Sequence, residues 1–393
     1  MREFRRLILF SCVGVLANVA FPITDFTFFS VSDPHYGKSG DANDSGRTAV
    51  PGLLNNLAGQ NYPSALGGGP IAIPRGVTMP GDLVDRVDTT LWEQYTTAYS
   101  PLDGKAKMKY AVYDGMGNHD VGEGNTDQRI RVRFIQRNGL RTNLVKFDSL
   151  NYHYSWDWDQ VHFVQLNLYG GSSTAVSTFD GYRAYEFLKA DLEKNVGASG
   201  RPVIVLQHIP MDSEDARWQD PDKLKMALLL KDYNCIGIVH GHTHGKRIYK
   251  YMDLDVFDDG SAMFKDIMVF HVTDGNMVVA NRVGNAWGDL VFSKNISMGV
   301  PVTRLKASPN VPRVASEFKF SVEGLGRICA ANRRASGVEI RTPAGHLVRR
   351  IQTFGTDLIW DRRDESGRAA IPGLYLARIL TDAGVVNAKV LLH

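Results

Sequence analysis

The sequence predicts an α/β protein with a smaller all-β module at its C-terminal end. Two observations support this prediction. Up to about residue 297, apolar runs typical of buried strands alternate with helix-like segments, a pattern that indicates sheets covered on both faces. Beyond that point, short alternating stretches are separated by glycine-containing turns at regular spacing, which is typical of a β-sandwich. A chain of 393 residues has room for about two domains.

Six apolar runs carry the strand prediction. They occupy residues 25–37, 70–85, 108–120, 161–169, 201–210 and 233–245. Helix-like segments lie at 182–196 and 221–233, and their scarcity in the middle of the chain predicts a mixed sheet or a sandwich core. In the first helix we expect one apolar face, with Phe187 off it. That face consists of Tyr182, Tyr185, Leu188, Leu192 and Val196.

Three local features refine this picture. Residues 38–70 are rich in Gly and Asn and predict an insertion with one short helical piece. Pro80 predicts an edge strand or a strand end. Alternation in 151–158 places four aromatic residues on one strand face, which we expect to be core, although a substrate platform is the alternative. These are Tyr152, Tyr154, Trp156 and Trp158.

The first twenty residues are typical of a secretory signal. A basic start, MREFRR, is followed by the apolar run LILFSCVGVLA and by small residues at Ala17 and Ala20. An uncleaved anchor is one alternative, and a lipoprotein modified at Cys12 is another. We therefore expect export to the cell surface, the medium or the periplasm. After cleavage, no other stretch is long and apolar enough to span a bilayer.

Charge and cysteine content narrow the possible functions. From Arg304 onward there are fifteen Lys and Arg against eight Asp and Glu, so the tail is basic and the remainder is mildly acidic. An acidic body disfavours tight nucleic-acid binding. After signal cleavage only Cys235 and Cys329 remain, so a disulfide framework is not expected. We predict a catalytic domain at 21–297, a linker at 298–312 and a β-sandwich at 313–393.

Five of the six apolar runs end in residues that bind metals. Ligand sites in α/β sheets collect beyond the carboxyl ends of strands, so these five ends are expected to converge. Each motif alone also has a structural explanation, such as a turn, a helix cap or a satisfied polar residue. Together they supply seven donors. These are Asp33, His35, Asp82, Asn118, His208, His242 and His244.

The series Asp-x-His, Gly-Asp-x-x-Asp, Gly-Asn-His-Asp, His and Gly-His-x-His resembles the calcineurin-like metallophosphoesterase superfamily over residues 25–295. The resemblance implies a two-sheet β-sandwich flanked by helices in four layers, with two metal ions in its cleft. It implies that Asp33, His35, Asp82 and His244 hold one ion. It implies that Asp82, Asn118, His208 and His242 hold the other, so that Asp82 bridges.

Imidazoles with carboxylate or amide oxygens suit Mn, Fe or Zn, and two ions sharing a carboxylate can activate a bridging hydroxide to attack phosphorus. The resemblance also implies that His119 protonates the leaving oxygen or stabilises the transition state, with Asp120 orienting it. Asp85 is expected to be structural. Arg217 could contact phosphate or stay solvated, and Tyr36 could reach the cleft.

The last 55 or so residues resemble the small Ig-like domains of the FlgD or type IX secretion sorting kind. The markers are Trp360-Asp361, Ser366-Gly367-Arg368, Pro372-Gly373 with Tyr375, and a final strand that ends in KVLL. This resemblance implies contact with export machinery or the cell surface. A plain stabilising sandwich is the alternative.

The sequence therefore predicts an exported, binuclear metal-dependent hydrolase of phosphomonoesters or phosphodiesters. Its expected partner is a small phosphoester, and nucleic acid is not expected. The rival prediction is an inactive metal-binding or adhesion protein displayed through its C-terminal sandwich.

Overall fold

The structure is a computed structural model. In the larger part of the chain it describes residues 25–100, 106–121, 129–171, 183–213, 218 and 220–296. Towards the C-terminus it describes 317–322, 326–331, 335–343, 345–352, 357–360, 362–371, 373–381 and 384–392. The chain divides into two compact units, Met1–Arg304 and Leu305–His393. The predicted signal segment and linker lie outside the described residues and remain predictions.

The first sheet has six strands in the order β13-β12-β11-β1-β2-β3. β1, β2 and β3 are parallel, while β11, β12 and β13 add an antiparallel half. Their bounds are Ala286–Asn295, Asn276–Val283, Asp266–Val272, Phe26–Ser30, Pro74–Met79 and Val112–Asp114. β2 lies between two neighbours and ends one residue before Pro80, so this proline marks a strand end and leaves the ladder intact.

The second sheet has seven strands in the order β4-β5-β6-β7-β8-β10-β9. β6, β7, β8 and β10 are parallel, and the outer strands are antiparallel to their neighbours. Their bounds are Leu144–Phe147, Tyr154–Trp158, Val161–Gln165, Pro202–Leu206, Asn234–His240, Leu254–Asp259 and Lys246–Tyr251. All six predicted apolar runs therefore contain strands. The sequence analysis did not predict β4 or β9 to β13.

Aromatic side chains join the two sheets face to face. The Phe28 ring centroid on β1 lies 5.3 Å from that of Phe163 on β6 and 5.7 Å from that of Trp158 on β5. Tyr152, Tyr154, Trp156 and Trp158 are all buried, so the expected core face is a core face. Packing of this kind contributes about 0.5–1.5 kcal/mol per aromatic pair beyond the area buried.

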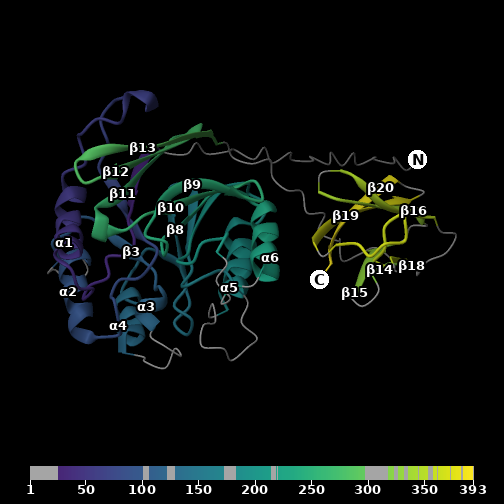
Figure 1. Ribbon diagram of the computed structural model, residues 1–393, viewed down its shortest axis with the longest axis horizontal. Helices are drawn as coiled ribbons and strands as arrows, with labels where there is room; N and C mark the ends of the chain where they lie inside the picture. Colours follow the sequence, from purple (N-terminus) through teal and green to yellow (C-terminus); the bar gives the residue numbers. More distant parts are fainter. Residues whose placement is uncertain are drawn as a thin grey trace, which may run out of the picture. The chain divides into compact units, whose positions relative to one another are not determined.

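Helices cover the outer faces of both sheets (Figure 1). Two of them, α1 and α2, lie beside the first sheet, and α5 and α6 beside the second, giving the α/β sandwich that the sequence predicts. Within the described residues, α1 to α6 are Asp41–Asn55, Thr89–Tyr99, Asn118–Val121, Arg129–Asn138, Ala184–Asp191 and Asp220–Lys231. Short helical turns are η1 at Ser64–Leu66, η4 at Leu192–Val196 and η5 at Ala262–Phe264. Among the described residues, no helix is both long and apolar enough to cross a bilayer.

Two helix predictions need correction. The insertion at 38–70 holds a helix of 15 residues, α1, where a short piece was expected. This helix packs closely on η5, because a Cβ at Gly46 would lie 1.7 Å from the carbonyl oxygen of Met263. Phe187 was expected off the buried face of α5 but is buried. The α-helix gives way to the π-helical turn η4 at Leu192, so a single 3.6-residue period does not hold across the segment.

The C-terminal unit is built from strands, as its alternating pattern predicts. One sheet has the order β15-β14-β18 and the other β17-β16-β19-β20. Their bounds are Gly326–Ala331, Glu317–Val322, Asp357–Trp360, Leu347–Gln352, Ala335–Arg341, Gly373–Thr381 and Gly384–Leu392. The rings of Trp360 and Tyr375 join the two sheets, with centroids 5.1 Å apart. Kinship with sorting-type Ig-like domains remains a prediction.

Candidate metal centre

The carboxyl ends of parallel strands from both sheets bring the predicted donors together. Asp33 and His35 follow β1, Asp82 follows β2, and Asn118 follows β3. His208 follows β7, while His242 and His244 follow β8. The structure gathers six of these residues into two groups whose donor atoms lie within 4.8 Å of one another. The groups are Asp33, His35, Asp82 and His244, and then Asp82, His208 and His242.

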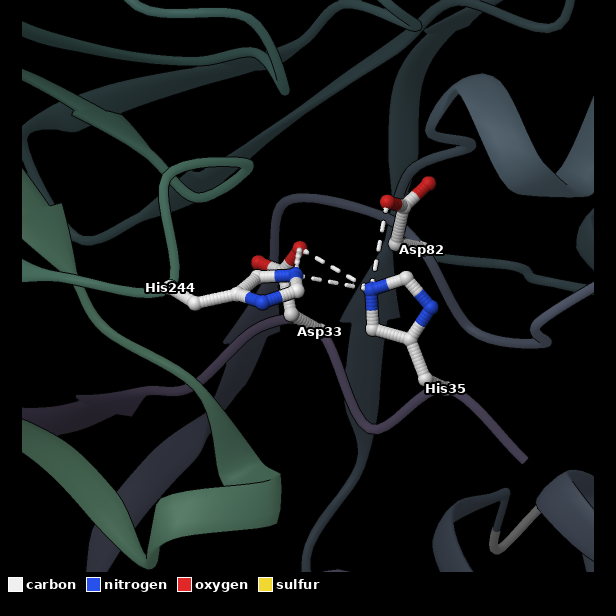
Figure 2. Close-up of side chains that lie close together, drawn as sticks. All are labelled: Asp33, His35, Asp82 and His244. Carbon is white, nitrogen blue, oxygen red and sulfur yellow. Dashed lines mark hydrogen bonds and ion pairs between the residues drawn. The ribbon is translucent and has the colours of Figure 1, made fainter. Parts of the chain in front are cut away.

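In the first group, His35 lies at the centre (Figure 2). Its Nε2 is 3.4 Å from Asp82 Oδ2, 3.6 Å from Asp33 Oδ1 and 2.9 Å from His244 Nε2. His244 Nε2 is in turn 3.3 Å from Asp33 Oδ1. Four donor atoms from three separate loops therefore face one another, as the ligands of a single ion would.

The second group contains Asn118 as well. His208 Nε2 is 3.2 Å from Asp82 Oδ2 and 3.2 Å from Asn118 Oδ1. His242 Nδ1 is 3.0 Å from the same amide oxygen. One oxygen of Asp82 thus faces His35 in the first group and His208 in the second. All seven predicted donors are placed together, and Asp82 is shared.

The backbone at these residues adopts an uncommon conformation. Five of the seven have positive φ, namely Asp33 at 52°, His35 at 42°, Asp82 at 53°, His242 at 74° and His244 at 57°. Left-handed conformers of non-glycine residues cost about 1–3 kcal/mol each and persist where the surroundings enforce them, which is common at functional sites. Gly241 allows the close approach, because a Cβ there would lie 2.2 Å from both Asp33 Oδ2 and Ser32 Oγ.

Burial and neighbouring charges shift the pKa values of these donors in opposite directions. Burial opposes the ionisation of Asp82, but the neighbouring His208 lowers its pKa to about 2. Burial likewise opposes the charge of His208, and Asp82 raises its pKa to about 9. Burial also acts against ionised Asp33, but the neighbouring imidazoles of His244 and His35 hold its pKa well below the ordinary value. The two carboxylates are therefore anions, which is the state that binds a cation.

The donors also fit a metal by their hydrogen bonding. Asp33 Oδ2 accepts the backbone N–H of His242, whereas Asp33 Oδ1 is buried and has no hydrogen-bond partner among the described residues. That oxygen is the one that faces His35 and His244. A buried carboxylate oxygen without a donor is costly unless a cation takes it. Imidazole and carboxylate or amide oxygen, with no thiolate, suit Mn, Fe or Zn.

His119 lies at the mouth of this cluster. Its side chain is 37% exposed, and its ring centroid is 4.7 Å from that of His35. Nδ1 lies 2.6 Å from the carbonyl oxygen of Asp85, so Nδ1 carries a hydrogen and donates it. The side chain of Asp85 also approaches His35, at 3.6 Å from Nδ1. Asp85 is thus the residue that orients His119.

Asp120 does not orient His119 as expected. Its carboxylate accepts the backbone N–H groups of Leu83, Val84 and Gly117 at 3.1, 3.0 and 2.7 Å. Burial and the negative charge of Asp82 raise the pKa of Asp120 to about 8. Asp120 therefore holds the loop that carries Asp82.

The expectation for Tyr36 turns out differently, and that for Arg217 is not tested. Tyr36 packs edge-on against Tyr95 and Tyr99 and lines a separate 410 Å³ cavity beside α1 and α2. Arg217 lies outside the described residues, so its contact with phosphate remains a prediction.

Sequence reasoning also missed Phe264 on η5, which is 49% exposed with its ring centroid 6.4 Å from that of His244. Its only sequence signal is a bulky apolar residue in a turn.

Comparison with known proteins assigns this fold and donor set to a family. Residues 27–246, more than half of the chain, match the calcineurin-like phosphoesterase family. The chain therefore belongs to that family, a class of hydrolases that act on phosphoester bonds.

Individual relatives are distant. The chain is 26% identical over 182 residues to "Probable inactive purple acid phosphatase 9" of Arabidopsis thaliana, a match that covers 39% of this chain. It spans about a quarter of that relative's length, 26%. Among solved structures, it resembles GAP50, the anchor in the inner membrane complex of Plasmodium, with 15% identity, TM-score 0.47 and coverage of 70% and 89% of the two chains. The protein TT1561 of Thermus thermophilus has 11% identity, TM-score 0.38 and coverage of 69% and 99%. Likenesses at these scores carry no argument about activity.

Proposed function

We propose that this chain is a binuclear metal-dependent hydrolase of small phosphomonoesters or phosphodiesters. The observation that carries the proposal is the position of Asp82. Its Oδ2 lies 3.4 Å from His35 Nε2 and 3.2 Å from His208 Nε2, so one carboxylate oxygen serves two adjacent donor groups. A shared carboxylate is the arrangement that keeps two cations close enough to act on one phosphoryl group.

The chain's own residues would divide the work as follows. Asp33, His35 and His244 would hold one ion, Asn118, His208 and His242 the other, and Asp82 both. When bound, the ions supply Lewis acidity and lower the pKa of a water molecule so that it can act as nucleophile near neutral pH. The buried donors would hold the ions in fixed positions.

His119 would serve the leaving group. Since Nδ1 donates to the Asp85 carbonyl, Nε2 is the nitrogen that can pass a proton to the departing ester oxygen. Its 37% exposure places it where a substrate can reach it. A purely metal-storing site has no use for a hydrogen-bonded imidazole at its mouth, which favours catalysis over the rival proposal of an inactive binding or adhesion protein.

The experiment that tests the proposal starts from the full chain after processing. The protein is stripped with a chelator, reloaded with Mn, Fe or Zn, and analysed for metal content and for turnover of p-nitrophenyl phosphate and its bis-ester. We expect two ions per chain and turnover of at least one ester. One ion per chain would contradict the binuclear site. Two ions with no turnover under any metal would favour the inactive alternative, a role printed in the name of the plant relative.

We also propose that the protein is exported and that its C-terminal unit contacts export machinery or the cell surface. The basic and apolar start of the sequence and the strand-rich final 80 or so residues support this. Cell fractionation with an antibody against each unit tests it. Retention of the full-length chain in the cytoplasm would count against export.

A further inference from the structure

A buried carboxyl group outside the donor set lies behind Asp33. Asp259 ends strand β10 and is fully buried. Its Oδ2 is 2.6 Å from Ser30 Oγ, and its Oδ1 is 2.6 Å from Ser32 Oγ. Ser32 Oγ is in turn 2.5 Å from Asp33 Oδ2. A continuous path of short oxygen–oxygen contacts thus runs from Asp259 through one hydroxyl to a predicted metal ligand.

If both carboxyl groups were ionised, this path would have too few hydrogens for its short oxygen–oxygen contacts. Ser32 has a single hydroxyl hydrogen, yet its oxygen lies within hydrogen-bonding distance of Asp33 Oδ2, Asp259 Oδ1 and the carbonyl of Gly260. If both carboxyl groups were ionised, at least one of the two short contacts would set a carboxylate against a hydroxyl lone pair. A hydrogen supplied by one of the carboxyl groups removes the conflict.

The environment decides which carboxyl group holds that hydrogen. Asp33 Oδ1 faces imidazole nitrogens of His35 and His244 at 3.6 and 3.3 Å, and Asp33 Oδ2 accepts the backbone N–H of His242, so its surroundings favour a negative charge. Burial raises the pKa of Asp259 well above its ordinary value, and the negative charges of Asp33 and Asp258 raise it further, although hydrogen bonds from Ser30 and Ser32 act to lower it. A charge buried in this way without a cationic partner would be neutralised.

We propose that Asp259 is a neutral carboxylic acid that donates its hydrogen to Ser32, and that Ser32 then donates to Asp33 Oδ2. This fixes the Asp33 carboxylate so that its Oδ1 faces His35 and His244. Asp259 is therefore a positioning residue for the metal site, acting through Ser32. Gly241 packs directly against this path, since a Cβ there would lie 2.2 Å from both Ser32 Oγ and Asp33 Oδ2.

The proposal rests on the proposed metal site for its functional consequence, but the protonation of Asp259 can be tested without metal. The first experiment is the infrared difference spectrum between the metal-free wild type and the D259N variant. We expect the wild type to show the C=O stretch of a protonated carboxyl group that the variant lacks. A carboxylate band in its place would overturn the proposal, whether or not the protein is an enzyme.

The second experiment measures metal affinity by competition with a chromogenic chelator, with melting temperature as a check on folding. An amide can accept from Ser30 through its oxygen and donate to Ser32 through its nitrogen, so D259N should bind metal within about threefold of wild type. S32A removes the path and should weaken binding about 10–100-fold, the usual effect of losing a group that orients a ligand. If S32A folds poorly, S32T serves as the second variant. It keeps the hydroxyl group and should bind metal.

Equal losses in D259N and S32A would show that a negative charge at Asp259 is what matters, and would overturn the proposal. Wild-type affinity in a folded S32A would do the same. Failure of the proposed function looks different, since the wild type would then bind no metal, or bind it without turnover, while the infrared difference remained.

Discussion

Two buried clusters of histidine and aspartate in the described part of the chain differ in one physical respect. His162 on β6 is fully buried, with Nδ1 2.7 Å from Asp157 and Nε2 2.8 Å from Asp191. Both carboxylates have further donors, Arg201 for Asp157 and Ser155 and Asn195 for Asp191. In the strand-end cluster, by contrast, imidazole nitrogens face one another and Asp33 Oδ1 has no donor from any described residue.

The difference shows how a structural cluster can be told from a site. Every polar atom of the imidazole in the His162 cluster has a partner within the protein, so the cluster is complete. The strand-end cluster leaves Asp33 Oδ1 without a hydrogen-bond donor from the described residues, and a bound cation would remove that cost. Composition does not separate the two clusters, because both are His and Asp. What separates them is whether each polar atom has a hydrogen-bond partner within the described part of the protein.

Replacing the shared ligand should have the largest effect. Asp82→Ala removes the oxygen common to both groups, so we expect metal content to fall and kcat/KM to drop by about a thousandfold or more, since several kcal/mol of charge stabilisation would be lost. Metal analysis and a phosphoester assay measure the two effects. The Asp157→Ala variant is the control from the complete cluster, and it should keep its metal. Full metal occupancy in Asp82→Ala would contradict the bridging role.

Replacing His119 should have the second-largest effect, and it should affect catalysis alone. His119→Ala is expected to lower kcat by about a hundredfold or more, the usual range for a lost general acid, while metal content stays at the wild-type level. The loss should be smaller for esters with good leaving groups, which need less protonation. A variant that loses metal together with activity would show that His119 is a ligand.

The complete cluster should affect stability, with a defined pH dependence. Burial alone would lower the pKa of His162, but hydrogen bonds to Asp157 and Asp191 raise it above its ordinary value. A raised folded-state pKa means that the stabilisation is fully present below the unfolded pKa and is lost as pH rises through the folded one. His162→Phe should therefore lower the free energy of unfolding by about 3 kcal/mol at pH 5, and by less at pH 9.

Urea unfolding of wild type and variant at the two pH values measures this difference. The metal content and kcat of the folded variant should not change, because His162 lies outside the site. An equal loss at both pH values would mean that folding leaves the pKa of His162 at its ordinary value.

Replacing Phe264, which lies beside the donor cluster, should have the smallest effect. Phe264 is held on η5, where Ser261 Oγ accepts the N–H of Met263 and α1 packs against the turn. An exposed ring fixed beside His244 can stack on a flat substrate group, a contact of about 0.5–1.5 kcal/mol. Phe264→Ala should lower kcat/KM for aryl esters about threefold to tenfold relative to alkyl esters. Equal losses for both ester types would argue against stacking.

The sequence was most informative where a motif coincided with an apolar run. The five strand ends with Asp, Asn or His could be read directly, because a buried strand and its terminal polar residue are adjacent in sequence. β4 and β9 to β13 were missed. Much of β13 is exposed and polar, and "KRIYKY" in β9 alternates too weakly to separate strand from loop.

The finer roles could not be predicted because they depend on contacts between distant segments. Asp120 follows His119 in sequence, yet its carboxylate accepts N–H groups from residues 83 and 84. Asp259 is 227 residues from Ser32 and carries no motif of its own. Nothing local distinguishes such a carboxyl group from a solvated one.

The left-handed turns at five of the donors have a consequence for evolution and for engineering. Their strain is held in place by the rigidity of the strands before them, which depends on packing as distant as Phe28 against Phe163. A core substitution that merely softens this framework would let the turns relax toward ordinary angles long before the sandwich unfolds. The first sign of such a core substitution would then be a loss of bound metal during purification, while the circular dichroism spectrum stays unchanged.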